Sequence, residues 1–298
     1  MAGVLSNLSD ALAAVVAQTS PSVVRVDARQ RMGASGIVWS ADGVIVTSHH
    51  VIERDENIKI GLHGGDSVSA SLVGSDPTTD IAVLRVTGKT LTPASWVGVE
   101  TAKVGHIVLA LGKPGDTVRA AMGIVSAMGD SWTTSAGGRI DKYLQTEVVM
   151  YPGFSGGPLV DADAKVLGLN SSSLARGVSV TIPTSTVKRV VETLLSGGKI
   201  QRGYLGIGTQ PVRLNPELAK QTNQEVGLLI VNVAGGSPAE KGGLLLGDII
   251  ISLGGRPSRS IDDMITTISS SPVGQPLSIG VIRAGKMSEL KVPVGEHP

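Results

Sequence analysis

Short apolar runs separated by polar turn clusters dominate the first two thirds of the chain. Between about Val23 and Thr87, six such runs have the alternation or dense β-branched content typical of strands. Six more lie between His106 and Pro183. The runs are SVVRVDA, ASGIVWS, GVIVTSH, NIKIGL, SVSASLVG and IAVLRV, then HIVLALG, VRAAMGIVSAMG, RIDKYLQTE, GGPLVD, KVLGLNSSS and GVSVTIP. Two sets of six short strands predict two antiparallel barrels or sandwiches.

Two segments instead have apolar residues at helical spacing. One predicts a helix over about Thr184–Leu195, with Gly197 after its end. The other predicts a short amphipathic helix near the start of the chain that packs on the body. The apolar positions are Val187, Val190, Val191 and Leu194 in the first helix and Leu5, Leu8, Leu12 and Val15 in the second.

Beyond Lys199 the pattern mixes strands with helices. Strand-like YLGIGTQ, GLLIVNV and DIIISL precede IDDMITTISS, whose apolar residues lie on one helical face, and PLSIGVI and SELKVPV follow. This change predicts a separate, smaller α+β domain over residues 199–298 after a mostly β domain over residues 1–198.

Composition narrows the classes of function. The chain has 298 residues, a net charge of +1 and no cysteine, which excludes disulfides and thiolate chemistry. No basic stripe or aromatic platform supports nucleic-acid binding. No apolar run approaches the roughly 20 residues that span a bilayer. The first residues lack a basic leader, so we expect a cytoplasmic protein, or a periplasmic or otherwise extracytoplasmic one whose export segment has been removed.

The stretch MYPGFSGGPLV places Ser155 among three glycines just before an apolar run. Glycine and serine are common in turns for backbone reasons alone, so the stretch has two interpretations. Ser155 is either a nucleophile on a sharp turn or part of an ordinary loop. A nucleophilic serine needs a base, an acid that orients the base, and donors for the oxyanion. The N–H groups of Gly153 and Ser155 are candidate donors.

Five histidines are available as the base. His49 and His50 close the run GVIVTSHHVI, and on an alternating strand their side chains point to opposite faces. At most one of them therefore faces Ser155, and the residues alone leave the choice open. The same divergence argues against a metal site at this pair, so we expect no metal. The other histidines, His63, His106 and His297, are weaker candidates.

The candidate acid is Asp80, which directly precedes the strongly apolar run IAVLRV. Such a run carries its first residue into the interior, where a carboxylate needs a partner. Asp76 stands before Pro77, which favours a turn that its side chain holds.

Four stretches in order, TSHHVI, DPTTDIAVLRV, MGIVSAM and YPGFSGGPLV, resemble the signatures of the HtrA (Deg) trypsin-like serine proteases. RGYLGIG and GSPAEKGGLLLGDIIISLGGRP resemble the PDZ domain that follows the protease in this family. The resemblance covers nearly the whole chain from Val15 onward. It implies two six-stranded antiparallel trypsin-like β-barrels followed by a small PDZ domain.

By this resemblance the catalytic residues are His50, Asp80 and Ser155, and the oxyanion hole uses the N–H groups of Gly153 and Ser155 with Phe154 between them. The family degrades unfolded or damaged proteins without ATP and needs no cofactor. Its members generally form trimers through the protease domain, which implies a homotrimer here.

Two departures from the family pattern stand out. Phe154 occupies the position where the family usually has asparagine, and GKPGD over residues 112–116 replaces a GNPFG-like loop. A bulky side chain at this position can hold the turn in an inactive conformation. The alternative function is therefore a catalytically silent module that binds peptides or acts as a chaperone.

The resemblance also implies a specificity pocket and a peptide site. Relatives that prefer basic residues carry aspartate six positions before the nucleophile, where this chain has Val149. With Val178 and Val180 as the facing wall, the pocket is expected to prefer small or medium aliphatic residues. In the PDZ domain, the loop that binds a free apolar C-terminus is expected at Tyr204, Leu205, Gly206 and Ile207, and the groove at Ile261, Met264 and Ile265.

Overall fold

The computed structural model describes residues 2–30, 32–174, 179–197 and 203–296. The chain divides into two compact units, Met1–Ile200 and Gln201–Pro298. The boundary expected between residues 198 and 199 lies outside the described residues. Within the described ranges, no helix combines the length and apolar character needed to cross a membrane.

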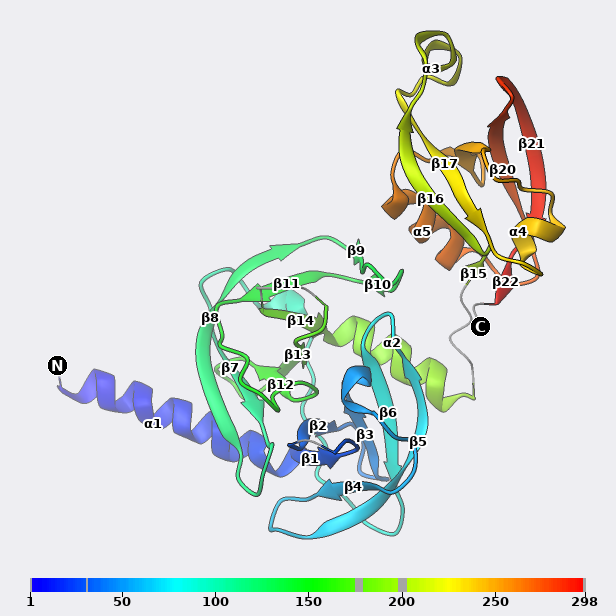
Figure 1. Cartoon of the computed structure of the whole chain (residues 1–298). Coiled ribbons are helices and arrows are strands. Elements are labelled where there is room, and N and C mark those ends of the chain that lie inside the picture. Colours follow the sequence, from blue (N-terminus) through cyan, green and yellow to red (C-terminus); the bar gives the residue numbers. More distant parts are fainter. Residues whose placement is uncertain (1, 31, 175–178, 198–202, 297–298) are drawn as a thin grey trace. The chain divides into compact units, whose positions relative to one another are not determined.

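Six antiparallel strands close the first barrel, in the order β1-β2-β3-β6-β5-β4 (Figure 1). They are β1 (Val23–Asp27), β2 (Ala34–Val38), β3 (Val44–Thr47), β4 (Ile58–Gly61), β5 (Ser67–Asp76) and β6 (Ile81–Val86). Because β1, β2, β3 and β6 are almost completely buried, their sequences are densely apolar, whereas β5 alternates between exposed and half-buried positions. All six predicted strands of this set are present.

A second closed barrel has the order β11-β14-β13-β12-β7-β8. Its strands are β7 (Ile107–Gly112), β8 (Arg119–Gly129), β11 (Tyr143–Thr146), β12 (Pro158–Val160), β13 (Val166–Ser171) and β14 (Ser179–Pro183). Of the two alternatives, barrels are therefore correct and sandwiches are wrong. A single strand over RIDKYLQTE is also wrong. That segment breaks at Asp141, whose N–H donates to Thr186 Oγ1, and its first part pairs in a hairpin of β9 (Trp132–Thr133) and β10 (Arg139–Ile140).

Helix α2 (Thr184–Leu195) has the predicted bounds. Its four apolar positions are buried, and the helix packs on β5 and β6 of the first barrel and on β13 and β14 of the second. Gly197 follows with φ of 74°, the left-handed conformation that ends many helices. Periodicity was sufficient here because one face of the helix meets both barrels and the other meets water.

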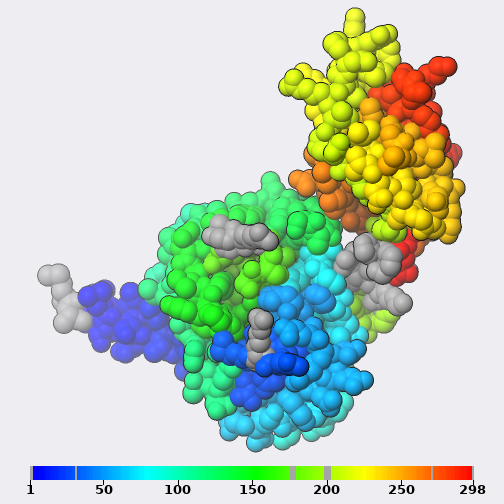
Figure 2. All heavy atoms as spheres, viewed as in Figure 1, coloured from blue at the N-terminus to red at the C-terminus, as the bar shows by residue number. Residues whose placement is uncertain are grey.

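Helix α1 (Ala2–Thr19) packs on the body only through its last turns. Val15 is buried and Leu12 is partly buried against the core, whereas Leu5 is 74% and Leu8 is 43% exposed. Figure 2 shows the first half of the helix standing clear of the rest of the first unit. The expectation that the whole apolar stripe packs on the body is therefore wrong, because the barrels end before the stripe does. The short 3-10 turn η1 (Ser20–Ser22) joins α1 to β1.

The second unit contains a sheet of order β16-β17-β18-β20-β21, with β19 paired to β18. The strands of this sheet are β16 (Ile207–Arg213), β17 (Val226–Val233), β18 (Ile249–Leu253), β19 (Arg256–Pro257), β20 (Pro276–Arg283) and β21 (Lys286–Pro293). Two further short strands, β15 (Gly203–Tyr204) and β22 (Gly295–Glu296), pair with each other. Its helices are α3 (Pro216–Thr222), α4 (Pro238–Lys241) and α5 (Ile261–Ser270). Helix α3 lies between the runs YLGIGTQ and GLLIVNV, where no element was predicted, and no residue of it is buried.

Candidate active site

The two adjacent histidines do not lie on a strand. Strand β3 ends at Thr47, and residues 49–51 form the 3-10 turn η2 (His49–Val51). Strand alternation therefore does not apply to these two side chains, and the prediction that it points them to opposite faces is wrong. In the turn, His50 Nδ1 lies 2.8 Å from Asp80 Oδ2, and the backbone N–H of His50 donates to Asp80 Oδ1 at 2.9 Å. The His49 N–H donates to the Asp80 carbonyl at 3.1 Å.

Asp80 is buried, with 2% of its surface exposed, immediately before β6. Its backbone has φ of 57°, a left-handed conformation that aspartate tolerates better than most residues. Besides His50, the hydroxyl of Ser171 donates to its Oδ2 at 2.6 Å. Burial acts to raise the pKa of Asp80, but the hydrogen bonds and charge of His50 and the bond from Ser171 outweigh it, so this pKa lies below its ordinary value.

Asp76 has the turn role that its position before Pro77 indicates. Its Oδ1 accepts the N–H and the hydroxyl of Thr78, and its Oδ2 accepts the hydroxyl of Thr79. A further bond runs from Thr134, in the turn between β9 and β10, to the Thr78 carbonyl at 2.8 Å. These contacts hold the loop that presents Asp80.

Ser155 lies in the turn that precedes β12, between two glycines with positive φ, 90° at Gly153 and 84° at Gly156. A Cβ added at Gly156 would lie 2.1 Å from the Ser35 carbonyl oxygen, so only glycine fits there. Among the residues that the structure describes, the N–H groups of Gly153 and Ser155 donate to no protein acceptor. Both are therefore available to a negatively charged oxygen.

Two adjacent serines at the end of β13 connect Ser155, the candidate nucleophile, to Asp80, the candidate acid. Ser171 binds Asp80, and the hydroxyl of its neighbour Ser172 lies 3.0 Å from Ser155 Oγ. Within the described ranges, no hydrogen bond joins Ser155 to His50. The run NSSS was predicted only as the end of a strand, and neither serine was predicted to belong to the site. Three consecutive hydroxyls after a buried strand were the available signal.

Phe154 is 1% exposed and belongs to the core of the second barrel. Its ring meets that of Tyr151 edge-on, with centroids 5.8 Å apart. A Cβ at Gly112 would lie 2.6 Å from its Cδ1, so the ring fills the space beside a residue without a side chain. Phe154 therefore packs against the first residue of the 112–116 loop.

The predicted specificity pocket is only partly available. Val149 is 58% exposed, whereas its neighbour Val148 is 2% exposed and lies in the core. Val180 is fully buried on β14, so its assignment to an open pocket wall is wrong. Val178 lies outside the described residues. Val149 therefore stays the candidate for contact with a substrate side chain.

In the second unit, the loop from Tyr204 to Ile207 joins β15 to β16. Leu205 is 1% exposed and anchors the loop in the core, and Gly206 has φ of 81°. Of the described residues, none accepts the N–H group of Leu205 or Gly206. The loop therefore offers two backbone donors at the start of an edge strand.

Helix α5 packs beside that edge strand, β16. Met264 is 6% exposed and contacts Thr209 of β16 through its sulfur at 3.6 Å, while Ile261 and Ile265 are partly buried. The capping box of Ser260 and Asp263 fixes the start of the helix. An edge strand beside a half-exposed apolar helix has the geometry that accepts an added strand.

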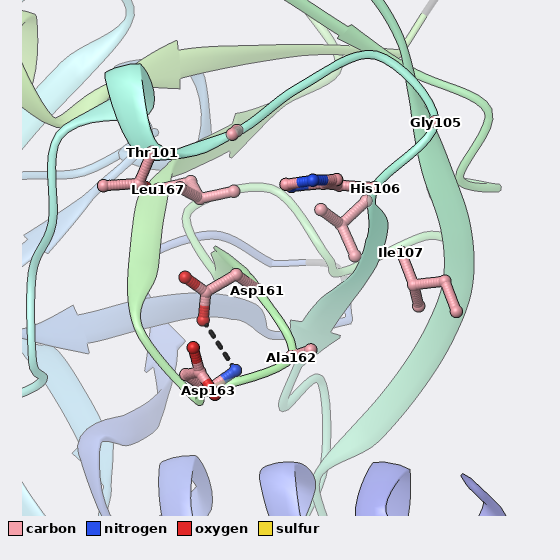
Figure 3. Close-up of a pocket in the computed structure, with 10 residues that line it drawn as sticks. Thr101, Gly105, His106, Ile107, Asp161, Ala162, Asp163 and Leu167 are labelled. Carbon is pink, nitrogen blue, oxygen red and sulfur yellow. Dashed lines mark hydrogen bonds between the residues drawn. The ribbon is translucent and has the colours of Figure 1, made fainter.

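A hollow on the second barrel, drawn in Figure 3, contains none of the predicted site residues. His106 lines it together with Asp161 and Asp163, and the dashed line marks the bond from the Asp163 N–H to the Asp161 carboxylate. Among the described residues, no group of three or more histidines or carboxylates is placed to hold a metal ion.

The bond from Ser171 to Asp80 makes a pH-dependent contribution to stability. A carboxyl whose pKa is lowered on folding stabilises the fold above its unfolded pKa, about 3.9, and loses that effect as the pH falls through its folded value. Ser171→Ala removes one of the bonds that lower the Asp80 pKa, so the stability deficit of the variant is expected to be largest above about pH 4 and to shrink on acidification.

Urea midpoints between pH 3 and 7 measure this deficit. All three tryptophans, Trp39, Trp96 and Trp132, lie in the first unit, so their fluorescence follows its unfolding. Ser179→Ala is the matched control, because that hydroxyl bonds a backbone carbonyl of Val148 and no carboxylate. A deficit of Ser171→Ala that is the same at every pH contradicts the prediction.

Comparisons with known proteins show which family the chain belongs to. The family model of a trypsin-like peptidase domain matches residues 34–169, and that of a PDZ domain matches residues 203–294. A putative serine protease HhoB from Synechocystis sp. is 34% identical over 288 residues, covering 91% of this chain and 68% of that protein. A probable periplasmic serine endoprotease DegP-like from Chlamydia muridarum is 32% identical over 280 residues.

That alignment covers 92% of this chain and 56% of the Chlamydia protein, so the chain spans about half the length of several curated relatives. Among solved structures, the HtrA-type protease AlgW with tripeptide has a TM-score of 0.74 at 31% identity, covering 96% of this chain and 97% of that one. The serine endoprotease from Yersinia pestis has a TM-score of 0.76 at 28% identity. The chain belongs to the HtrA (DegP-like) family of trypsin-like serine proteases and carries one PDZ domain.

Proposed function

We propose that this protein is an ATP-independent serine endopeptidase in which Ser155 is the nucleophile, His50 the base and Asp80 the residue that orients the base. The observation that carries the proposal is the buried carboxylate of Asp80, which accepts a hydrogen bond from His50 Nδ1 at 2.8 Å. Ser171, which bonds Asp80, and its neighbour Ser172, which lies beside Ser155, connect this carboxylate to the nucleophile. A carboxylate at Nδ1 fixes the tautomer in which Nε2 is an acceptor.

In the reaction, Ser155 Oγ attacks the scissile carbonyl carbon and its proton passes to His50 Nε2. The protonated imidazole is stabilised by Asp80 and then delivers that proton to the leaving amine. Because the Ser155 hydroxyl rests against Ser172, a rotation of the Ser155 side chain precedes the attack. Such catalytic bonds often tighten only when substrate is bound. Water hydrolyses the acyl-enzyme by the same proton path.

The oxyanion forms beside the N–H groups of Gly153 and Ser155. Backbone donors do this work, so the side chain of Phe154 does not have to contribute. Its ring points into the core of the second barrel rather than toward the substrate. This placement favours the enzyme over the alternative, a silent peptide-binding or chaperone-like module, because the position most altered from the family pattern leaves both donors unoccupied.

For substrates, we propose unfolded or damaged polypeptides cut after small or medium aliphatic residues. The exposed apolar side chain of Val149 and the lack of a carboxylate at its position support the second half of this proposal. The relatives' names, which include the word periplasmic, support an extracytoplasmic location for the protein. Cell fractionation that recovers it only with cytoplasmic markers would reject this location.

The PDZ domain is proposed to recruit or regulate through apolar C-termini. An incoming C-terminal strand would pair with β16, its carboxylate would accept the N–H groups of Leu205 and Gly206, and its last side chain would contact Met264 and Ile265 of α5. The protease domains are proposed to assemble as a homotrimer. The exposed apolar half of α1, with Leu5 74% exposed, supplies surface for that assembly.

Ser155→Ala is expected to lower casein cleavage by about 10⁴-fold or more, because no other group replaces the nucleophile. The assay contains EDTA and no ATP, and Ser69→Ala, an exposed serine on β5, is the control. Mass spectrometry of the wild-type fragments is expected to show cuts after Val, Ala or Leu. Equal cleavage by wild type and Ser155→Ala contradicts the role of Ser155, and predominant cuts after Lys or Arg contradict the pocket.

A fluorescent peptide ending in a free apolar residue is expected to bind the whole chain at least about tenfold more tightly than its C-terminal amide. The amide lacks the charge that the backbone donors of the loop would bind, and charge-assisted bonds are about twice as strong as neutral ones. Fluorescence anisotropy with Ser155→Ala, which cannot cut the peptide, measures both affinities. Equal affinities would remove the carboxylate from the proposed recognition.

Sedimentation equilibrium is expected to give about three times the chain mass of 30.5 kDa. Replacing both Leu5 and Leu8 by aspartate is expected to weaken the assembly, because charges in an apolar interface are costly to desolvate. The exposed pair Lys59→Ala on β4 and Ser69→Ala on β5 is the control. A wild type of single-chain mass at micromolar concentration contradicts the trimer.

A further inference from the structure

Ser35 is a polar residue, the second of the five in strand β2, and no part of the predicted site includes it. Every residue of that strand is buried, and Ser35 is 0% exposed. A buried hydroxyl without partners costs stability, so its contacts indicate what the position requires.

The Ser35 hydroxyl accepts one hydrogen bond and donates another. Its Oγ accepts the N–H of Lys113 at 2.7 Å and lies 2.6 Å from the carbonyl oxygen of Gly153. A carbonyl can only accept, so the single hydroxyl proton is directed at Gly153. The backbone N–H of Ser35 donates to the carbonyl of Ser155 at 3.1 Å. One residue of the first barrel therefore holds the carbonyls on both sides of Phe154.

These bonds set the directions of the peptide units in the turn of residues 151–155, which we call the oxyanion turn. The Gly153–Phe154 unit is held at its carbonyl by Ser35 and at its N–H by the Tyr151 carbonyl at 3.0 Å. The next unit is held at the Phe154 carbonyl by the Gly157 N–H at 2.9 Å. In a trans peptide the N–H is opposite the carbonyl, so the Ser155 N–H is left pointing away.

Gly153 needs an external restraint because it has no side chain of its own. At φ of 90° it adopts a conformation that glycine enters and leaves with little penalty. A turn that relaxed around Gly153 would present fewer N–H groups to a developing negative charge. The hydroxyl of Ser35 restrains the Gly153 carbonyl, which belongs to the peptide unit between the two units that carry the donor N–H groups.

We propose that Ser35 is a positioning residue that keeps the oxyanion turn in its donor-presenting conformation. It touches neither substrate nor nucleophile side chain, and it acts through Gly153. The proposal rests on the proposed peptidase function for its effect on rate, but the restraint itself is a property of the fold and can be measured without catalysis.

Ser35→Ala is expected to lower kcat about 10- to 100-fold, less than the 10²–10³ that loss of a whole oxyanion donor costs. KM is expected to stay within about threefold, because the contacts that weaken are those to the oxyanion, which exists only in the transition state and the intermediate. Ser35→Thr keeps the hydroxyl and is expected to restore kcat to within about threefold of wild type. Ser22→Ala is the matched control, since this buried hydroxyl bonds the Thr19 carbonyl far from the oxyanion turn.

Amide hydrogen exchange of the fragment covering residues 150–157 tests the restraint independently of activity. Exchange of the bonded amides of Phe154, Gly156 and Gly157 is expected to accelerate about tenfold or more in Ser35→Ala and to stay unchanged in Ser22→Ala. If the alanine variant does not fold, Ser35→Cys replaces it, since a thiol is a weak donor of similar shape.

Wild-type exchange and wild-type kcat in Ser35→Ala overturn the proposal, as does an equal loss of activity in Ser22→Ala. A wild-type protein that cleaves nothing and forms no adduct with a fluorophosphonate rejects the proposed peptidase instead. In that case the exchange experiment still decides whether Ser35 restrains the turn.

Discussion

A carboxylate buried between two barrels constrains the whole of the first unit. Moving an isolated charge out of water costs several kcal/mol even after the protein relaxes, so Asp80 can be buried only with partners in place. His50 supplies two of them from the first barrel, and Ser171 supplies one from the second. The barrels therefore have to meet at one relative position for the charge to be satisfied, and that position brings Ser155 to the same place.

Close approach of backbones is the second requirement of this meeting. Gly156 lies against the carbonyl of Ser35, where a Cβ has no room, and Gly112 gives way to the ring of Phe154. The aromatic ring anchors the turn in the second barrel by burial, while hydrogen bonds from Ser35 anchor it to the first. A turn rich in glycine is intrinsically loose, and here apolar packing and buried bonds together provide its rigidity.

Among its described residues, the second unit also places unbonded backbone N–H groups next to a buried side chain. Leu205 is held in the core while its own N–H and that of Gly206 remain unused by the described residues. An ion pair between the buried Asp248 and the partly exposed Arg283, at 2.7 Å, ties β20 to the loop before β18. Arg283 also lowers the pKa of Asp248 against the opposing effect of burial. In both units, backbone donors point outward because side chains pinned in the core hold the loops that carry them.

The sequence by itself determined most of the strands, helix α2 and the order of histidine, aspartate and serine. Alternating and dense apolar runs report which face of an element is buried, and helix α2 followed its 3.6-residue period to both ends. The family resemblance added the choice of His50 over His49, which residue-level reasoning left open. Local periodicity shows that one face of a helix is apolar but does not specify what covers that face, so it could not predict that Leu5 is exposed.

Only the tertiary structure decided which polar groups meet. Ser171 and Asp80 are 91 positions apart, and Ser35 and Gly153 are 118 apart. Their contacts arise when two closed barrels come together. In the local sequence pattern, a serine inside an apolar strand indicates only a residue of slightly lower strand propensity. Its importance comes from the carbonyl that barrel closure places 2.6 Å from its hydroxyl, and no pattern along the chain encodes that distance.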